Sequence, residues 1–438
     1  KKKGSPAQLT ALSCYCPCLL RRSVAVAVAA GAASSTRRNL PIISSTMAPT
    51  ACSTSSSLIV FRALPLFLLL SDAFLQTHGA GMGINYGQIA NNLPSPSRVV
   101  GLLQSLNVSR VKLYDADPNV LLAFANTNVE FIIGLGNEYI QSVPDAAKAQ
   151  AWIETHVKPY IGRTKITCIT VGNEVDNSND TQLLTNLVPA MQSVYKALVN
   201  LGLDKQVTVT TAHSLNILAT SYPPSAGSFR PDLAEVIQPL LSFHSQTGYP
   251  FLINAYPFFA YKGSPDEVSL DYALFGSNNT GMTDPITNLY YDNMLYAQVD
   301  AVYSAIKAMG HTNIEVKVSE TGWPSKGDAD EVGATPQNAG LYNGNLFKRV
   351  QARQGTPAKP SVPIDVHVFA LFNEDLKPGP TSERNYGLFY PDGSPVYNMG
   401  FHAYLPEGTD IAYTSASGSD GSPVFSLIVF LVAYLMCL

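Results

Sequence analysis

Short runs of β-branched and other apolar residues alternate with longer stretches of helical spacing between Gly81 and Tyr404. This alternation is typical of parallel α/β domains, in which a helix follows each strand. The eight runs are Met82–Tyr86, Arg110–Tyr114, Glu130–Leu135, Lys165–Val171, Gln206–Thr211, Phe251–Tyr256, Ile314–Ser319 and Ile364–Phe372. Eight βα repeats predict a (β/α)8 TIM barrel, with a single domain at residues 81–404. No Gly-x-Gly-x-x-Gly follows the first run, which argues against a dinucleotide-binding fold.

The segments between the runs contain two further signals. Pro144-Asp145-Ala146-Ala147 predicts the start of a helix that continues to Val157. The stretch from Tyr222 to Pro231 is rich in Pro, Gly and Ser. We expect it to be a surface loop that lies over the cleft of the domain.

Two segments before the barrel are expected to take no part in the fold. Residues 1–46 are basic and are interpreted as upstream sequence; a metal knuckle at Cys14, Cys16 and Cys18 is disfavoured because no histidine or second cysteine pair lies nearby. Residues 47–80 contain an apolar stretch followed by small residues. This pattern predicts a secretory signal peptide, since the stretch is shorter than the roughly 20 residues of a membrane-spanning helix.

The C-terminal region has the features of a lipid-anchor signal. Residues 405–423 form a Ser/Gly-rich linker, and residues 424–438 are almost entirely apolar. Small residues, a polar spacer and an apolar tail that is removed are typical of a glycosylphosphatidylinositol (GPI) anchor. A true membrane helix is the alternative. We therefore expect a secreted protein on the outer leaflet of the plasma membrane.

Cysteine use and charge narrow the class of protein. Without the two end regions, Cys168 is the only cysteine that remains of the six, and we expect it to be a buried strand thiol. Three Asn-x-Ser/Thr sequons, at Asn107, Asn179 and Asn278, are candidate glycosylation sites. The net charge of −4 argues against a nucleic-acid partner.

Two apolar runs end in a lone acid. Val318–Pro324 places Glu320 at the end of the seventh run, and Ile169–Glu174 places Glu174 at the end of the fourth. Strand C-termini form the active-site face of a TIM barrel. Each acid taken alone is more often a cap for the next helix, but two at one face indicate a glycoside hydrolase, which needs a pair of carboxyl groups. A separation of about 5 Å would make Glu320 the nucleophile and Glu174 the acid/base of a retaining double displacement.

Several segments resemble the plant endo-1,3-β-glucanases of glycoside hydrolase family 17, namely Gly83–Gly87, Val171–Val175, Asn254–Phe258, Val318–Pro324, Phe372–Lys377 and Ser382–Arg384. The resemblance covers residues 81 to 404. It implies a (β/α)8 barrel with the same roles for Glu174 and Glu320. It also implies that Glu374, Lys377 and Glu383 form a charged cluster that holds the geometry of the nucleophile; a solvated salt bridge is the alternative.

Further residues are candidates for substrate contact. Asn173 is expected to hydrogen-bond a substrate hydroxyl or the nucleophile. Tyr86 and Tyr256 end strands, and their phenols suit stacking and hydrogen bonding. Aromatic side chains also supply flat faces for pyranose rings, and the candidates are Trp323, Phe259 and Phe372. Packing in the core is the competing interpretation for each aromatic residue.

The remaining polar residues at strand ends are interpreted as structural. His213 is expected to be a hydrogen-bonded structural group, and Asp115 and Asp117 are expected to cap the next helix. No cluster of His, Cys and Asp has metal-ligand spacing, so we expect neither a metal nor a cofactor.

The sequence therefore predicts a monomeric retaining endo-hydrolase of β-1,3-glucan, of the callose or laminarin type. A transglycosylase and a mixed-linkage β-1,3;1,4-glucanase remain open, because loop and cleft shape decide between them. A non-catalytic glucan-binding protein is the alternative from another class. The retained pair Glu174 and Glu320 argues against it.

Overall fold

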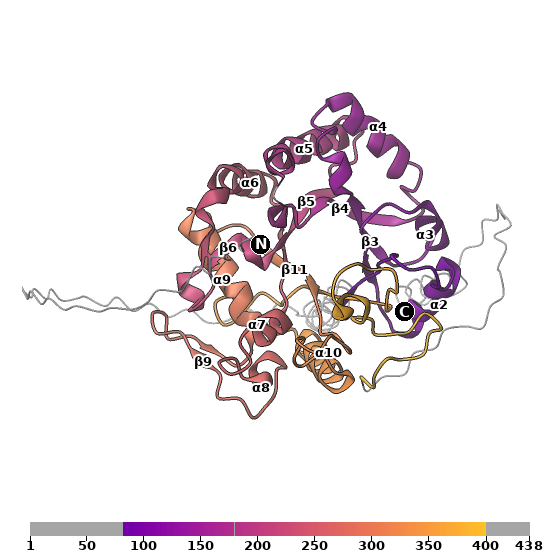
Figure 1. Cartoon of the computed structure of the whole chain (residues 1–438). Helices are drawn as coiled ribbons and strands as arrows, with labels where there is room; N and C mark the ends of the chain where they lie inside the picture. Colours follow the sequence, from indigo (N-terminus) through magenta and orange to yellow (C-terminus); the bar gives the residue numbers. More distant parts are fainter. Residues whose placement is uncertain (1–81, 179, 400–438) are drawn as a thin grey trace, which may run out of the picture. The chain divides into compact units, whose positions relative to one another are not determined.

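The computed structural model describes residues 82–178 and 180–399. Eight parallel strands close a barrel in the order β1-β12-β11-β8-β5-β4-β3-β2. Their bounds are β1 (Gly83–Asn85), β2 (Arg110–Lys112), β3 (Glu130–Leu135), β4 (Lys165–Asn173), β5 (Thr208–Ser214), β8 (Phe251–Asn254), β11 (Val316–Thr321) and β12 (Val366–Val368). Each strand lies within or overlaps one of the eight predicted runs, so the predicted (β/α)8 barrel is confirmed. In Figure 1 the labelled barrel strands surround the centre of the domain and helices α2 to α6 lie outside them.

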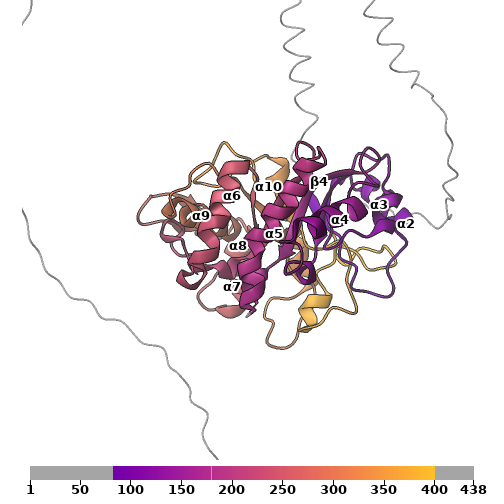
Figure 2. The ribbon, with the colours of Figure 1, turned by 90° about the horizontal axis from the view of Figure 1, so that it is seen from above.

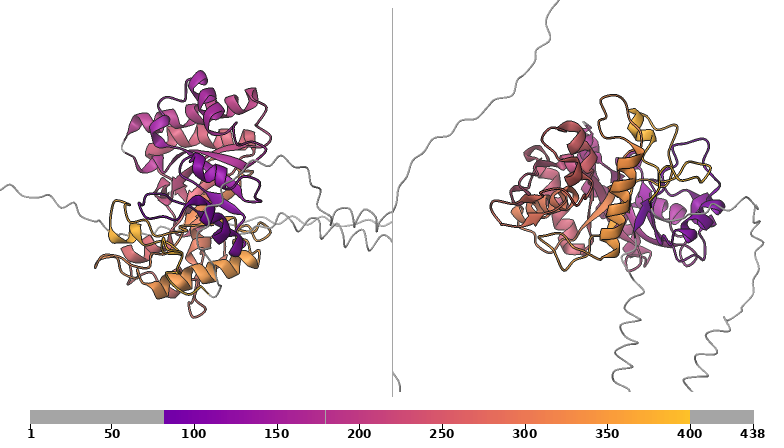
Figure 3. Two further views of the ribbon diagram at one scale, coloured as in Figure 1. Left: turned by 90° about the vertical axis from the view of Figure 1, so that its right-hand side faces the viewer. Right: turned by 90° about the horizontal axis from the view of Figure 1, so that it is seen from below.

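The α-helices surround the barrel or follow its strands at their C-terminal ends. They are α2 (Pro96–Ser105), α3 (Pro118–Ala123), α4 (Ala146–His156), α5 (Thr181–Asn200), α6 (Ala234–Thr247), α7 (Pro257–Gly263), α8 (Leu270–Ala273), α9 (Met294–Ala308) and α10 (Pro336–Gln351). Helices α4, α5 and α6 pack as consecutive neighbours (Figure 2). Helix α10, orange in Figure 3, lies on the outside of the domain.

The predicted helix start near Pro144 is confirmed. Helix α4 begins at Ala146, and the carboxylate of Asp145 accepts hydrogen bonds from the backbone N–H groups of Ala147 and Lys148. A carboxylate at this position satisfies backbone donors that have no partner within the helix. Local sequence chemistry is therefore sufficient to place this helix.

Short strands and 3-10 helices lie in the segments that follow the barrel strands. The antiparallel pairs are β6 (Leu218–Thr220) with β7 (Ser228–Phe229), and β9 (Met282–Thr283) with β10 (Tyr290–Tyr291). The 3-10 helices are η1 (Asn137–Tyr139), η2 (Val175–Asn177), η3 (Leu215–Ile217), η4 (Pro224–Ala226), η5 (Pro231–Leu233) and η6 (Thr381–Arg384).

The segment from Tyr222 to Pro231 does not occupy the place that we expected. Its elements η4 and β7 contact α9. A Cβ added at Gly227 would lie 2.1 Å from the carbonyl oxygen of Ala301, so only glycine permits this close approach. The backbone N–H and the hydroxyl of Ser225 also bond to the carboxylate of Asp284, each at 2.8 Å. These contacts hold the segment against α9 and the turn between β9 and β10, and none of its residues lines the catalytic cavity.

The barrel strands are buried on both faces, as expected for a parallel sheet covered by helices. All four residues of β8 are buried, and so is the thiol of Cys168 on β4, as predicted. No helix among residues 82–178 and 180–399 has the length and apolar character to cross a membrane. The predicted segments at residues 1–46, 47–80, 405–423 and 424–438 lie outside the described residues.

Candidate active site

One cavity at the C-terminal ends of the barrel strands contains both predicted catalytic acids. Its volume is about 420 Å³. It is lined by Gly87, Gln88, Ile89, Tyr114, Asp115, Asn173, Glu174, Tyr256, Phe259, Glu320, Phe369, Glu374, Lys377, Glu383 and Tyr386. The barrel thus brings together side chains from segments more than 250 residues apart in the sequence.

The backbone of β4 changes direction just before Glu174. Gly172 has φ +73°, and Glu174 itself has φ +49° and ψ +40°, a left-handed conformation that few residues other than glycine adopt. The pairing of β4 with β5 also shifts register between Thr170 and Asn173. Such irregularities redirect side chains next to active sites. Here the irregularity lies directly before an acid that lines the cavity.

Strand β11 is irregular at the equivalent place. Its pairing with β8 shifts register between Val318 and Glu320, and Glu320 is then the partner of Asn254. Both acids therefore follow a local break in the strand ladder. An uninterrupted strand would alternate its side chains strictly between the two faces of the sheet.

Glu320 is buried and is bonded on both carboxylate oxygens. The ammonium of Lys112 donates to Oε1 at 2.6 Å, and the hydroxyl of Tyr256 donates to Oε2 at 3.0 Å. Burial by itself would raise the pKa of this carboxyl. The charge and hydrogen bond of Lys112, a hydrogen bond from Tyr114 and the charge of Lys377 together outweigh burial, so the pKa lies below its ordinary value. Glu320 is accordingly held as a carboxylate.

Glu174 has a different environment. Its Oε1 accepts a hydrogen bond from the amide of Asn254 at 2.8 Å, and its Oε2 accepts one from the amide of Asn177 at 3.0 Å. Asn254 is itself oriented by Ser319, whose hydroxyl donates to the Asn254 Oδ1 at 2.6 Å. Burial, followed by the negative charge of Glu320, raises the pKa of Glu174 to about 7. A carboxyl with this pKa can hold a proton near neutral pH.

Asn173 contacts the ammonium that pairs with Glu320. Its Oδ1 accepts from the ammonium of Lys112 at 3.3 Å. Its backbone is fixed by Asn137, which accepts from the Asn173 N–H at 2.9 Å and donates to the Asn173 carbonyl at 3.1 Å. Asn173 thus reaches Glu320 through Lys112, while its side chain still lines the cavity.

The predicted charged cluster lies in the same cavity. Lys377 pairs with Glu383 at 3.5 Å, and Glu374 Oε1 accepts from the backbone N–H of Ile89 at 2.8 Å. Lys377 also lies 4.3 Å from the centre of the Phe369 ring. No hydrogen bond between Glu320 and the cluster is seen in the described part of the chain, and Lys377 acts on the nucleophile through its charge, which lowers the pKa of Glu320.

Three aromatic residues that we expected to contact substrate lie in the core. The indole of Trp323 is 0% exposed, packs against Phe258 and donates to the Gly333 carbonyl. Tyr86 and Phe372 are each 2% exposed and pack edge to face against one another. All three rings belong to the buried hydrophobic core, so a sugar ring has no exposed face to rest on. The expectation was wrong for these three residues.

Phe259 and Tyr256 line the cavity. Phe259 is 48% exposed and its ring lies 5.4 Å from that of Tyr256. An exposed ring at the edge of a cavity is a suitable surface for the apolar face of a sugar. The structure therefore leaves Phe259 as the candidate stacking residue among those that we named.

The residues interpreted as structural are largely as expected. His213 contacts the carboxylate of Asp176 at 3.2 Å, and Asp117 caps α3 through the Asn119 N–H. Asp115 instead lines the cavity and accepts from the Asp117 N–H. Among residues 82–178 and 180–399 no group of three or more His, Cys, Asp or Glu side chains is arranged to hold a metal ion.

Sequence reasoning did not identify Lys112, Tyr114 or the role of Asn254. Lys112 is buried in β2, where its ammonium lies 4.4 Å from the centre of the Tyr114 ring. A lysine inside the run Arg110–Tyr114 interrupts an apolar strand, and burying a lysine is costly unless it is paired. That interruption is the signal that indicates a buried anion as its partner.

Comparisons with known proteins agree with this architecture. The sequence pattern of the family described as Glycosyl hydrolases family 17 matches residues 82–401. Glucan endo-1,3-beta-glucosidase 14 of Arabidopsis thaliana is 66% identical over 364 residues, which are 83% of this chain and 91% of the relative.

Two solved structures of plant proteins are also similar. CJP38, a beta-1,3-glucanase and allergen of Cryptomeria japonica pollen, is 40% identical with a TM-score of 0.70, over 73% of this chain and 98% of that chain. A structure from a study of two plant beta-glucan endohydrolases with distinct substrate specificities is 35% identical with a TM-score of 0.67, over 73% and 100% of the respective chains. The chain therefore belongs to glycosyl hydrolases family 17.

Proposed function

We propose that this enzyme hydrolyses internal (1→3)-β-D-glucosidic bonds of β-1,3-glucan with retention of configuration. The observation that carries the proposal is that the pKa values of two glutamates in one cavity are shifted in opposite directions. The pKa of Glu174 is raised to about 7, while the pKa of Glu320 is lowered. A pair of carboxyl groups pushed apart in this way supplies one acid and one anion at the same pH. The names of the similar proteins support the substrate.

In the first step, a carboxylate oxygen of Glu320 attacks the anomeric carbon. The bond from this carbon to the glycosidic oxygen breaks, and Glu174 transfers its proton to that oxygen. The product is a glycosyl ester on Glu320 and a shortened glucan with a free hydroxyl. Lys112 favours the charged state of Glu320 before attack, because its ammonium lies 2.6 Å from Oε1.

In the second step, Glu174 is a carboxylate and accepts a proton from water. The water oxygen bonds to the anomeric carbon and the ester bond to Glu320 breaks. The second inversion restores the original anomeric configuration. Asn254 donates to Glu174 Oε1 and supports its orientation in both steps.

The test compares wild type with Glu174→Gln and Glu320→Gln on laminarin. We expect the loss of the nucleophile to lower kcat/KM by at least about 10³-fold. Loss of the acid/base is expected to lower it by about 10²–10⁴-fold. A β-glucoside with a good leaving group should restore the first step in Glu174→Gln and leave Glu320→Gln inactive. An active Glu320→Gln variant would overturn the role of this residue.

Product analysis separates the rival activities on the same site. Hydrolysis by retention gives β-anomers in the first products, which NMR detects before mutarotation. Transglycosylation would give chains longer than the laminari-oligosaccharide supplied. A mixed-linkage preference would give faster hydrolysis of β-1,3;1,4-glucan than of laminarin. Intact binding without turnover on any of these polymers would indicate a glucan-binding protein.

We further propose that the enzyme is a monomer, is exported and is held on the outer leaflet of the plasma membrane. The support for export and for the anchor is the sequence of residues 47–80 and 405–438. Asn107 and Asn278 are exposed, as acceptors of a glycan must be; Asn179 lies outside the described residues. Release from plant cell membranes by phosphatidylinositol-specific phospholipase C tests the anchor. Retention after this treatment would favour a membrane helix.

A further inference from the structure

A second cavity, of about 600 Å³, lies outside the catalytic one. It is bounded by the segment after β6, by α7 and α8, by β9 and by the first turns of α9. Helix α7 adjoins both cavities, since Phe259 lines the catalytic cavity and the next residue, Ala260, lines the second. The second cavity has the size of a small-molecule binding site.

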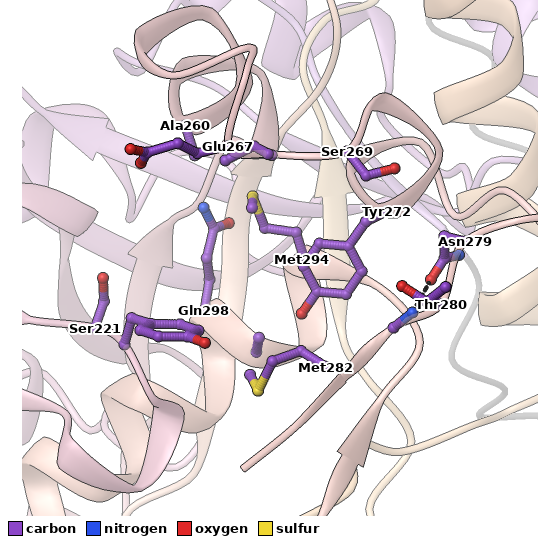
Figure 4. A pocket seen from close by; sticks show the side chains of 14 residues that line it. Ser221, Ala260, Glu267, Ser269, Tyr272, Asn279, Thr280, Met282, Met294 and Gln298 are labelled. Carbon is purple, nitrogen blue, oxygen red and sulfur yellow. Dashed lines mark hydrogen bonds between the residues drawn. The ribbon is translucent and has the colours of Figure 1, made fainter. Parts of the chain in front are cut away.

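Two polar groups of this cavity are buried without a partner in the part of the chain that the structure describes. They are the amide oxygen Oε1 of Gln298, a residue that is only 7% exposed, and the hydroxyl of Tyr272. Figure 4 shows both side chains pointing into the same space, beside Met294. Buried polar atoms are nearly always hydrogen-bonded in folded proteins. Each of the two atoms exposes less than 1 Å², so a ligand with hydroxyl groups bonds them once the two side chains turn toward the open part of the cavity.

The rest of the lining suits an uncharged ring with apolar faces. Tyr222 stands at the edge of the cavity and is 72% exposed, and Met282 and Met294 supply apolar walls. Among the lining residues Glu267 alone is charged at neutral pH, and no lining residue is a cation. The cavity therefore lacks the groups that recognise phosphate or carboxylate ligands. Aromatic and apolar surfaces combined with amide and hydroxyl groups match the apolar faces and polar edges of a pyranose.

We propose that this cavity is a second binding site for a segment of β-1,3-glucan. The choice of glucan rests on the proposed function. The site holds one part of the polymer while another part occupies the catalytic cavity, which α7 also lines. Two linked binding events raise the effective concentration of the chain at the catalytic site. The benefit is therefore expected for long or insoluble glucan and not for short oligosaccharides.

The test uses the full chain with Glu320→Gln, so that bound glucan is not hydrolysed. Tyr222→Ala and Gln298→Leu are compared with Tyr390→Ala, a matched control at a residue that is 45% exposed and lines neither cavity. We expect about fivefold weaker binding to insoluble β-1,3-glucan for Tyr222→Ala and Gln298→Leu. We expect no change for Tyr390→Ala. In the active background, kcat/KM for laminaritetraose should stay within about twofold of wild type for all three variants.

Two outcomes would overturn the proposal. The first is binding of insoluble glucan by Tyr222→Ala and Gln298→Leu that equals wild type, with thermal melting showing that both variants are folded. The second concerns the chain's own glycan, because Asn279 and Thr280 line the cavity and follow the acceptor Asn278. If Asn278→Gln abolishes the difference in binding of insoluble glucan between wild type and Tyr222→Ala, the cavity holds that glycan and not the substrate.

The proposed function can fail separately. Wild type that hydrolyses no β-glucan, yet binds insoluble β-1,3-glucan in a manner that depends on Tyr222, would overturn the hydrolase and retain the second site. If wild type hydrolyses β-1,3-glucan, and Tyr222→Ala and Gln298→Leu bind insoluble glucan as wild type does, the hydrolase is retained and the second site is overturned.

Discussion

The ammonium of Lys112 lies 2.6 Å from the Oε1 atom of Glu320, and the two side chains are only 1% and 7% exposed. They are 208 residues apart in the sequence. A buried ion pair of this kind is not by itself a source of stability, because both charges lose their hydration. Its consequence here is chemical, since the cation keeps the candidate nucleophile ionised.

Replacing Lys112 by Met should therefore raise the pKa of Glu320. The acid limb of the kcat/KM profile is expected to move to higher pH, and kcat/KM in the acidic range should fall by about tenfold or more. An unpaired buried carboxylate also costs about 3–5 kcal/mol of stability at neutral pH. The pH dependence of laminarin hydrolysis and urea unfolding measure the two effects. Lys148→Met, an exposed lysine on α4, is the control; an acid limb that does not move would contradict the role of Lys112.

The pKa of Glu174 predicts the alkaline limb of the profile of activity against pH. The acid must carry its proton to protonate the leaving oxygen, so activity is present below the pKa and is lost as pH rises through about 7. Part of this elevation comes from the charge of Glu320. In Glu320→Gln the pKa of Glu174 should consequently fall, which carboxyl 13C NMR measures with Glu174→Gln as the reference for assignment. A pKa that stays the same would show that burial alone sets it.

Removing the amide of Asn254 should raise the pKa of Glu174, whereas removing the charge of Glu320 should lower it. This amide donates to Glu174 Oε1 and lowers its pKa. Asn254→Ala is expected to shift the alkaline limb to higher pH and to lower kcat by about 10- to 100-fold, because the acid loses a charge-assisted hydrogen bond that orients it. Ser319→Ala, which removes only the group that orients Asn254, should have the smaller effect. A shift to lower pH in Asn254→Ala would contradict this assignment.

Trp323 and Phe259 should respond differently to truncation. Trp323→Ala removes a fully buried indole and is expected to cost about 3–5 kcal/mol of stability, while KM for laminarin changes little in the folded fraction. Phe259→Ala should leave stability nearly unchanged and raise KM by about two- to tenfold, because an exposed ring in the cavity is lost. Thermal melting and steady-state kinetics separate the two cases. A large KM effect in a fully folded Trp323→Ala variant would restore Trp323 as a substrate contact.

The sequence by itself determined the barrel and the position of its two acids. Apolar runs and helix signals such as Asp145 are local, since a strand or a helix start depends mainly on its own residues. Glu174 and Glu320 end their runs, and parallel strands closed into a barrel bring those ends to one face. Their presence in one cavity could therefore be predicted without coordinates.

Only the tertiary structure decided which side chains reach the cavity and which partners they find. Trp323 and Phe259 both follow strand ends, but packing against α7 and α10 buries the first, while the second is exposed. The pairing of Lys112 with Glu320 depends on the distance across the closed barrel. Exposure and long-range charge pairing depend on residues that are distant in sequence, so local patterns carry little information about them.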